Sequence, residues 1–347
     1  MNLKFKIYNL QLRHVFRIAR GEESIAPIVI VELHHDGIIG YGEAAPSSRY
    51  GESVETVVKF YHKINLAKFN SPFETDSIMN YLNSISDGDT SAKCGIDLAI
   101  HDWIGKKLNI SLSNYFGFDR SKLATSSFTI GMDSPEMLFK KIKEADDYPI
   151  LKIKLGSEND EETIKLIRKI TDKPLCVDAN EGWRDKNLAL ERIKYLEDQN
   201  ILFVEQPMPA NQIKDTEWLR EKSNLPLIAD ENVLSLSDIS KVANAFDGIN
   251  IKLMKCTGIR EAMRMIHTAQ GLNLKIMMGC MIESSIAISA GAQLLPMLNY
   301  PDLDGNVLIT NDPFDGLINK NGNILISNRP GLGVEPNEKY NSTPYLK

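Results

Sequence analysis

The chain has 347 residues, of which 43% are hydrophobic and 25% charged, and its net charge is −6. This is an ordinary soluble globular composition, and the acidic balance, with no run rich in Lys or Arg, excludes a nucleic-acid partner. No run approaches the ~20 apolar residues that span a bilayer, and the N-terminus lacks the apolar core of a signal peptide. The four cysteines form no Cys-x-x-Cys pair, so neither a zinc knuckle nor a disulfide framework is expected. We therefore expect a cytoplasmic protein that acts on a small molecule.

The N-terminal third predicts an α+β unit. Strands are expected at residues 2–10, 26–33 and 38–42, with a turn at Asp36-Gly37, which together predict an antiparallel meander. Helical patterns follow at 53–65, 74–85 and 91–107. Strands followed by a run of helices are typical of a separate domain, here about 120 residues long.

From about residue 124 the pattern changes to strand-helix repeats. Strands are expected near 125–130, 150–154, 174–178, 201–205, 226–229, 248–252, 274–278 and 306–309, and helices near 134–146, 158–171, 186–198, 211–223, 235–245, 258–271 and 283–296. Seven such units and one more strand predict a closed, modified TIM barrel of the form (β/α)7β. After about residue 317, Asn321-Gly322 between apolar residues predicts a small hairpin that returns to the N-terminal unit.

The fold class is therefore α/β with three parts. We expect an α+β capping domain at residues 1–122, a barrel at 123–316 and a C-terminal segment at 317–347 that completes the capping domain.

Charged residues close consecutive barrel strands. The carboxylates Asp178, Glu205 and Asp230 each end a short apolar run, and the strands on either side of them end at Lys154 and Lys252. Because all strand C-termini of a parallel barrel open on one face, we expect these five side chains to form one site.

Carboxylates without His or Cys suit a hard cation such as Mg²⁺, with one ion expected per subunit. The alternative for any one carboxylate is a helix cap; three in succession between lysines favour a metal site. Lys152 and Lys154 share one side of their strand, and Lys252 is expected on the far side of the metal. Of two lysines that face each other across a metal-bound carboxylate, one can remove the α-proton from one face and the other can deliver a proton to the opposite face. This arrangement predicts racemisation or epimerisation, or elimination where the substrate has a leaving group.

These residues resemble the enolase superfamily, whose lysine base and Mg²⁺-stabilised ene-diolate are a known pattern. The resemblance extends over the whole chain and is closest to the muconate-lactonizing-enzyme subgroup. The motifs that carry it are Lys152-Ile-Lys154, Asp178-Ala-Asn180, Glu205-Gln206-Pro207, Asp230-Glu231 and Lys252-Leu-Met-Lys255. One position departs from the pattern: Thr257 stands where the family often has a glycine, and we expect this to change only how the next helix begins.

Two further stretches resemble the dipeptide epimerases typified by the L-Ala-D/L-Glu epimerases. They are the stretch from Gly279 to Ser285 and the Asp-x-Asp motif formed by Asp302 and Asp304. In that family the Asp pair binds the ammonium group of the dipeptide. By itself the Asp302 stretch is also compatible with an ordinary acidic turn.

The resemblance implies roles for other residues. Arg20, in the loop expected after the first strand, could pair with a substrate glutamate, although a solvated arginine is an equal alternative. Ser127 is expected to contact the peptide backbone and Lys152 to contribute to substrate binding. Asn180, Gln206 and Glu231 are expected to orient the metal ligands and Lys152.

We therefore predict an isomerase, a Mg²⁺-dependent dipeptide epimerase with Lys154 and Lys252 as the acid/base pair. L-Ala-L-Glu, in murein-peptide metabolism, is the expected substrate. Dipeptides with hydrophobic or cationic side chains, muconate cycloisomerase activity and o-succinylbenzoate-type dehydration remain open. A barrel aldolase with a Schiff-base lysine and a non-catalytic metal-bound scaffold are further alternatives. The family commonly forms homo-oligomers, and no membrane partner is expected.

Overall fold

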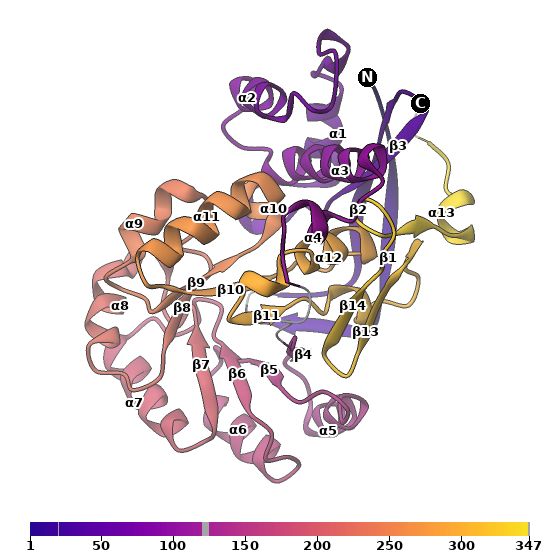
Figure 1. Ribbon diagram of the computed structural model, residues 1–347. Helices are drawn as coiled ribbons and strands as arrows, with labels where there is room; N and C mark the ends of the chain where they lie inside the picture. Colours follow the sequence, from indigo (N-terminus) through magenta and orange to yellow (C-terminus); the bar gives the residue numbers. More distant parts are fainter. Residues whose placement is uncertain (20, 120–124, 346–347) are drawn as a thin grey trace.

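The computed structural model describes residues 1–19, 21–119 and 125–345 (Figure 1). Its centre is an eight-stranded sheet in which every neighbouring pair is parallel and the strands follow one another in chain order. The strands are β4 (Phe128–Ile130), β5 (Leu151–Lys154), β6 (Leu175–Asp178), β7 (Ile201–Glu205), β8 (Leu227–Ala229), β9 (Gly248–Ile251), β10 (Lys275–Gly279) and β11 (Tyr300–Asp302). Ser127 N donates to Pro301 O at 3.2 Å, which brings the two ends of the sheet together into a nearly closed barrel.

Helices cover the outside of this barrel, as Figure 1 shows. They are α5 (Pro135–Glu144), α6 (Asp160–Arg168), α7 (Lys186–Glu197), α8 (Ile213–Arg220), α9 (Ile239–Val242), α10 (Leu253–Cys256), α11 (Ile259–Gly271) and α12 (Ser285–Ala292). Each strand-helix repeat expected from the sequence is present, although α9 and α12 are shorter than their sequence patterns indicate.

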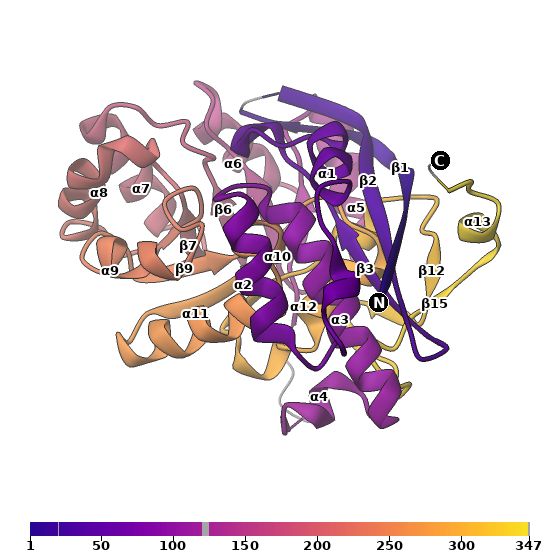
Figure 2. The ribbon, with the colours of Figure 1, turned by 90° about the horizontal axis from the view of Figure 1, so that it is seen from above.

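The N-terminal helices lie above the barrel in Figure 1, and in the view from above they lie in front of part of it (Figure 2). The N-terminal unit consists of the antiparallel strands β1 (Asn2–Ile18), β2 (Gly21–His35) and β3 (Ile38–Ala44), followed by α1 (Val54–Tyr61), α2 (Thr75–Ile85), α3 (Thr90–Leu108) and α4 (Leu112–Tyr115). Its apolar side chains form a core of their own, in which Phe60, Leu82 and Trp103 are buried.

The C-terminal segment contacts this unit. Its elements are β12 (Phe314–Asp315), β13 (Leu317–Lys320), β14 (Asn323–Ile326), β15 (Glu335–Pro336) and α13 (Glu338–Asn341), and β13 and β14 form the expected hairpin. Leu112 N donates to Gly331 O at 3.1 Å, and Leu332 N donates to Asp102 Oδ1 at 2.8 Å. We retain the three-part division as a proposal; its boundary at residue 122 lies outside the described residues.

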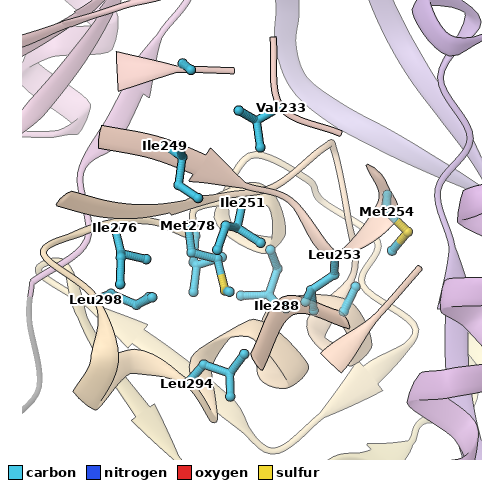
Figure 3. Packing of buried hydrophobic residues seen from close by; sticks show 14 of the residues in the cluster. Val233, Ile249, Ile251, Leu253, Met254, Ile276, Met278, Ile288, Leu294 and Leu298 are labelled. Atoms are coloured by element: carbon cyan, nitrogen blue, oxygen red, sulfur yellow. The ribbon is translucent and has the colours of Figure 1, made fainter. Parts of the chain in front are cut away.

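Side chains alternate between two environments along each barrel strand, as the period of two requires. On β9 and β10, Ile249, Ile251, Ile276 and Met278 pack among helix side chains in the largest apolar cluster (Figure 3). The alternate positions contribute a separate small cluster inside the barrel, made of Cys176, Phe203, Ile228 and Met277. This cluster fills the barrel below the next inward-facing positions, which are polar.

Two strand predictions from the sequence were wrong in detail. The eighth strand is Tyr300–Asp302, whereas residues Gly305–Val307, where the sequence predicted it, form a 3-10 turn. The first strand continues to Ile18, so Phe16 and Arg17 lie in β1 and not in a loop after it.

Among the described residues, no helix has the length and apolar character needed to cross a membrane.

Thr257 does not begin the helix after it. It ends α10 in the left-handed conformation, with φ 71°, and Gly258 is the N-cap of α11. The N-terminal amide of Ile259 donates to Asp97 Oδ2 on α3 at 2.6 Å, so a carboxylate of the N-terminal unit caps this barrel helix.

Candidate active site

The charged residues expected from the sequence lie at the C-terminal ends of neighbouring strands. Lys154, Asp178 and Glu205 are the last residues of β5, β6 and β7, and Asp230 and Lys252 directly follow β8 and β9. All five are at most 8% exposed. The strand register therefore collects these charges at the mouth of the barrel, above its apolar interior.

Lys152 links several of these carboxylates. Its Nζ lies 2.7 Å from Glu205 Oε2, 2.7 Å from Asp302 Oδ2 and 3.4 Å from Asp178 Oδ2. Burial alone would lower the pKa of Lys152, but the charges of these three carboxylates outweigh it and raise the pKa well above its usual value. Lys152 is therefore a fixed cation in this arrangement.

Lys154 and Lys252 approach the site from different strands. Lys154 Nζ donates to Asp178 Oδ2 at 2.6 Å, and Lys252 Nζ donates to Asp230 Oδ2 at 2.8 Å. Three strands, β6, β7 and β8, separate β5 from β9 in the sheet order. In a barrel of eight strands this separation places the two amines on opposite sides of the mouth.

The three carboxylates differ in how readily they ionise. Burial would raise the pKa of Asp178, but the charges of Lys154 and Lys152 lower it to about 2. Asp230 behaves in the same way: burial opposes ionisation, and the lysine charges, that of Lys252 foremost, hold its pKa well below the usual value. Burial, with the charge of Asp178 added, raises the pKa of Glu205 to about 7. Lys252 has a raised pKa because the charge of Asp230 outweighs desolvation.

A cavity of about 220 Å³ opens above these groups, between the barrel and the N-terminal unit. Its barrel side includes Lys152, Lys154, Asn180, Asp230, Lys252, Asp302 and Asp304. Its other side comes from the end of β1, with Phe16 and Ile18, and from residues 45–50 after β3. Both parts of the chain are therefore needed to enclose a ligand. Arg20, expected at this loop, lies outside the described residues.

The Asp302 and Asp304 pair lines one wall of the cavity. Ser127 Oγ donates to Asp302 Oδ1 at 2.7 Å, and the Thr129 amide donates to Asp304 Oδ2 at 2.6 Å. Burial and the charge of Asp302 raise the pKa of Asp304 to about 6. These hydrogen bonds fix the orientations of both side chains. Ser127 is buried and bonded to Asp302.

The residues expected to orient the ligands have mixed positions. The backbone amide of Asn180 donates to Asp178 Oδ1 at 2.9 Å. Gln206 Oε1 accepts from the backbone amide of Asp230 at 2.9 Å, so it holds the chain after β8 and not a ligand oxygen. Glu231 is buried but is not part of the cavity wall.

Two residues that contact the carboxylates were given no role from the sequence, although Lys255 ends one of the quoted motifs. Lys255 Nζ lies 2.5 Å from Asp230 Oδ1 and also donates to the backbone oxygens of Asp230 and Asn250. Asn250 Nδ2 donates to Glu205 Oε1 at 2.7 Å. The sequence signal for Asn250 is a polar residue inside a strand, two positions before Lys252 and therefore on the same side.

The donor set fits a hard divalent cation. The three carboxylates supply only oxygen, and Glu205 Oε2, buried and 2.7 Å from Lys152 Nζ, accepts no hydrogen bond of acceptable geometry. As the described side chains stand, no three His, Cys, Asp or Glu groups are arranged to hold an ion. The lysine ammonium groups instead balance the carboxylate charges.

Comparison with known proteins agrees with this architecture. Residues 4–117 match the model of the mandelate racemase/muconate lactonizing enzyme N-terminal domain, and residues 138–340 match the enolase C-terminal domain-like model. The L-Ala-D/L-Glu epimerase of Bacteroides thetaiotaomicron is 45% identical over 96% of this chain and 88% of that protein.

Two solved structures superpose closely. The N-succinyl Arg/Lys racemase of Bacillus cereus has a TM-score of 0.92 at 29% identity, covering 99% of both chains. The dipeptide epimerase of Cytophaga hutchinsonii, solved with Mg and the dipeptide D-Ala-L-Val, has a TM-score of 0.92 at 26% identity and covers 99% of this chain and 98% of that one.

The chain belongs to the enolase superfamily, in its mandelate racemase/muconate lactonizing enzyme subgroup. The three similar proteins described above are racemases or epimerases. The protein is accordingly an isomerase that acts on amino-acid derivatives, of the dipeptide epimerase family.

Proposed function

We propose that this enzyme epimerises the C-terminal residue of a dipeptide by proton transfer between Lys154, Lys252 and the α-carbon. The observation that carries the proposal is the position of the two amines, on strands separated by three others and each paired to a buried carboxylate. One amine can remove the α-proton from the tetrahedral carbon, and the flat intermediate that results can accept a proton on its other face from the second lysine's ammonium group. In this proposal Lys154 deprotonates the L-epimer.

The proposed metal ligands are Asp178, Glu205 and Asp230, with Mg²⁺ as the ion. When bound, a divalent cation supplies the positive charge that makes an α-proton beside a carboxylate acidic enough to remove. Lys152 adds a fixed positive charge beside Glu205 and Asp178, which suits a substrate carboxylate at this position.

Asp302 and Asp304 are the proposed partners of the substrate ammonium. Their buried, oriented carboxylates support a substrate with a free N-terminus over one with an N-terminal acyl carboxylate. Ser127 holds Asp302 in place, and in this proposal it also lies within reach of the peptide. Asn180, Gln206 and Glu231 are proposed to support the ligands, through backbone contacts in the first two cases.

The proposed substrate is L-Ala-L-Glu, converted to L-Ala-D-Glu in murein-peptide metabolism. The 45% identical relative, an L-Ala-D/L-Glu epimerase, supports this choice, and Arg20 is the proposed partner of the glutamate side chain. A dipeptide with a hydrophobic C-terminal residue is the second candidate, because the described capping side of the cavity presents Phe16 and Ile18.

The test is incubation of a library of L,L-dipeptides with the enzyme and Mg²⁺ in D₂O, followed by mass spectrometry and chiral separation. We expect deuterium at the α-carbon of the C-terminal residue and formation of the L,D-dipeptide, fastest for L-Ala-L-Glu. EDTA should abolish exchange, and added Mg²⁺ should restore it. Exchange confined to N-succinyl amino acids would replace the dipeptide proposal, and exchange that survives EDTA would overturn the metal role.

A further inference from the structure

Asn250 is the buried polar side chain that joins the carboxylate cluster to the next barrel strand. It lies on β9, is 0% exposed and contacts a different element through each end of its amide. Its Nδ2 donates to Glu205 Oε1 at 2.7 Å, and its Oδ1 accepts from the Gly279 amide at 2.7 Å. The first contact reaches from β9 to β7, past β8.

The orientation of this amide follows from chemistry. The Gly279 backbone N–H can only donate, so the oxygen of the Asn250 amide must face it and the NH₂ group must face Glu205. Gly279 also has the space that this contact needs. A Cβ at this position would lie 2.8 Å from Asn250 Nδ2, 2.9 Å from Oδ1 and 3.1 Å from Lys252 Cε. Glycine therefore lets the backbone approach the amide closely.

The consequence falls on Glu205. One of its oxygens is bonded to Asn250, and the other, Oε2, faces the cluster, where Lys152 Nζ forms an ion pair with it at 2.7 Å. A neutral amide donor holds the carboxylate in one rotamer without adding a charge or a proton. An ammonium in place of Asn250 would put a second positive charge on Glu205, beside that of Lys152, and would weaken the attraction of the carboxylate for a metal ion.

We propose that Asn250 is a positioning residue for the metal site: it fixes Glu205 so that Oε2 faces the ion. The inference rests on the proposed function, in which Glu205 is a metal ligand. Because Asn250 lies on β9 and Lys252 directly follows this strand, the same segment sets the position of an acid/base lysine relative to a metal ligand. Supporting contacts of this kind change metal affinity by about 10- to 100-fold when they are removed.

The experiment is isothermal titration of the full-length enzyme with Mg²⁺, without substrate, for wild type, Asn250→Ala and Asn250→Ser. Serine keeps a hydroxyl that can stay near the Gly279 amide but is too short to reach Glu205. We expect both variants to bind Mg²⁺ about 10-fold more weakly or worse. The matched control is Asn299→Ala, because Asn299 Oδ1 also accepts from a backbone amide of β10, that of Ile276 at 2.8 Å, at the opposite end of the strand.

A purely structural role for Asn250 predicts that the variants and the control lose thermal stability alike and bind Mg²⁺ as wild type does; that result overturns the inference. If wild type itself fails to bind Mg²⁺, the proposed function fails instead. A crystal structure of wild type with Mg²⁺ decides without any variant. Asn250 Nδ2 should remain bonded to Glu205 Oε1 with Oε2 on the ion, and a Glu205 released from Asn250 would contradict the inference.

Discussion

The mouth of the barrel and the capping loops line the same cavity but are held in different ways. At the mouth, Lys152, Asp178 and Glu205 are at most 2% exposed and belong to strands. In the capping part, Arg17 and Arg49 have side chains 41% and 39% exposed, and their ion pairs reach across to barrel loops. Strand pairing therefore fixes the residues at the mouth, whereas the capping side is held by a few ion pairs that are partly exposed to solvent.

This difference separates two tasks. Proton transfer requires amines held to within a fraction of an ångström, which buried side chains on strands provide. Selection among dipeptides requires a surface that can change without disturbing the strands, which loops provide. Substitutions at the mouth should thus affect the chemical step, and those in the capping part should affect substrate binding.

The largest effects are expected from the lysines. Lys154→Met and Lys252→Met should each lower epimerisation by roughly 10²- to 10⁴-fold, the usual contribution of one acid/base group. In D₂O, Lys252→Met should still exchange the α-proton of the L,L-dipeptide without epimerising it, because Lys154 remains. Lys154→Met should lose that exchange. Lys241→Met, 67% exposed on α9, is the control.

Chiral chromatography and mass spectrometry measure both products. Identical exchange by the two variants would contradict the assignment of one amine to each face. Retention of full epimerisation by either variant would contradict the proposed chemistry.

The next effect concerns the joint between the two regions. Glu43 on β3 is fully buried and accepts hydrogen bonds from the amide, at 3.0 Å, and the hydroxyl of Ser284, the N-cap of α12. Burial raises its pKa to about 7. Because the pKa of Glu43 is higher in the folded than in the unfolded protein, protonated Glu43 contributes to the free energy of unfolding. This contribution is fully present below about pH 4.5 and is lost as the pH rises through about 7.

Glu43→Gln cannot ionise, so it should remove this pH dependence. Between pH 4.5 and pH 8, the free energy of unfolding of wild type should fall on the order of 3 kcal/mol further than that of the variant. Urea unfolding at both pH values measures this difference. Glu221→Gln, at the exposed C-terminal end of α8, is the control. An equal pH dependence in Glu43→Gln and wild type would show that Glu43 is not the group that couples stability to pH.

The barrel mouth could largely be predicted from the sequence, because it follows from local patterns. An apolar run ending in a charged residue predicts a strand end, and alternation predicts which side Lys152 and Lys154 share. The eighth strand was misplaced because Tyr300–Asp302 is short and contains a proline. Its pairing with β10 is set by the rest of the sheet and not by its own pattern.

Contacts between residues far apart in the chain could not be predicted from the sequence. The extension of β1 to Ile18 depends on its pairing with β2 after a register shift between Gln11 and Phe16. The bond between Asn250 and Glu205 connects strands 45 positions apart in the chain. Such contacts exist only once the barrel has closed, so no local pattern predicts them.

A smaller effect is expected at the capping loop. Arg49 donates to Glu181 through Nε at 3.1 Å and through Nη2 at 2.9 and 3.0 Å, linking the loop after β3 to the loop after β6. A partly exposed ion pair contributes about 1 kcal/mol or less. Arg49→Met should therefore raise KM by up to about fivefold and leave kcat nearly unchanged. Lys214→Met, whose ion pair with Glu217 stays within α8, is the control for loss of an exposed cation.

Steady-state kinetics at low and high salt check this prediction. The difference between wild type and Arg49→Met should shrink as salt screens the pair. A large loss of kcat with unchanged KM would place Arg49 with the mouth and blur the distinction between the two regions.

The smallest effect is expected at Thr257, where the backbone between α10 and α11 is strained. Thr257 is β-branched yet has φ 71° and ψ 16°, between α10 and Gly258. Thr257→Gly relieves this strain, and the gain exceeds the entropy cost of glycine only modestly, so we expect about 0.5 to 1 kcal/mol of added stability by urea unfolding. Asn273→Gly, at φ 57°, is the matched control and should gain less, because asparagine tolerates this conformation. Epimerase activity should be unchanged in both variants, since neither side chain lines the cavity. A loss of stability in Thr257→Gly would contradict the prediction, because it would mean that packing of the threonine side chain outweighs its backbone strain.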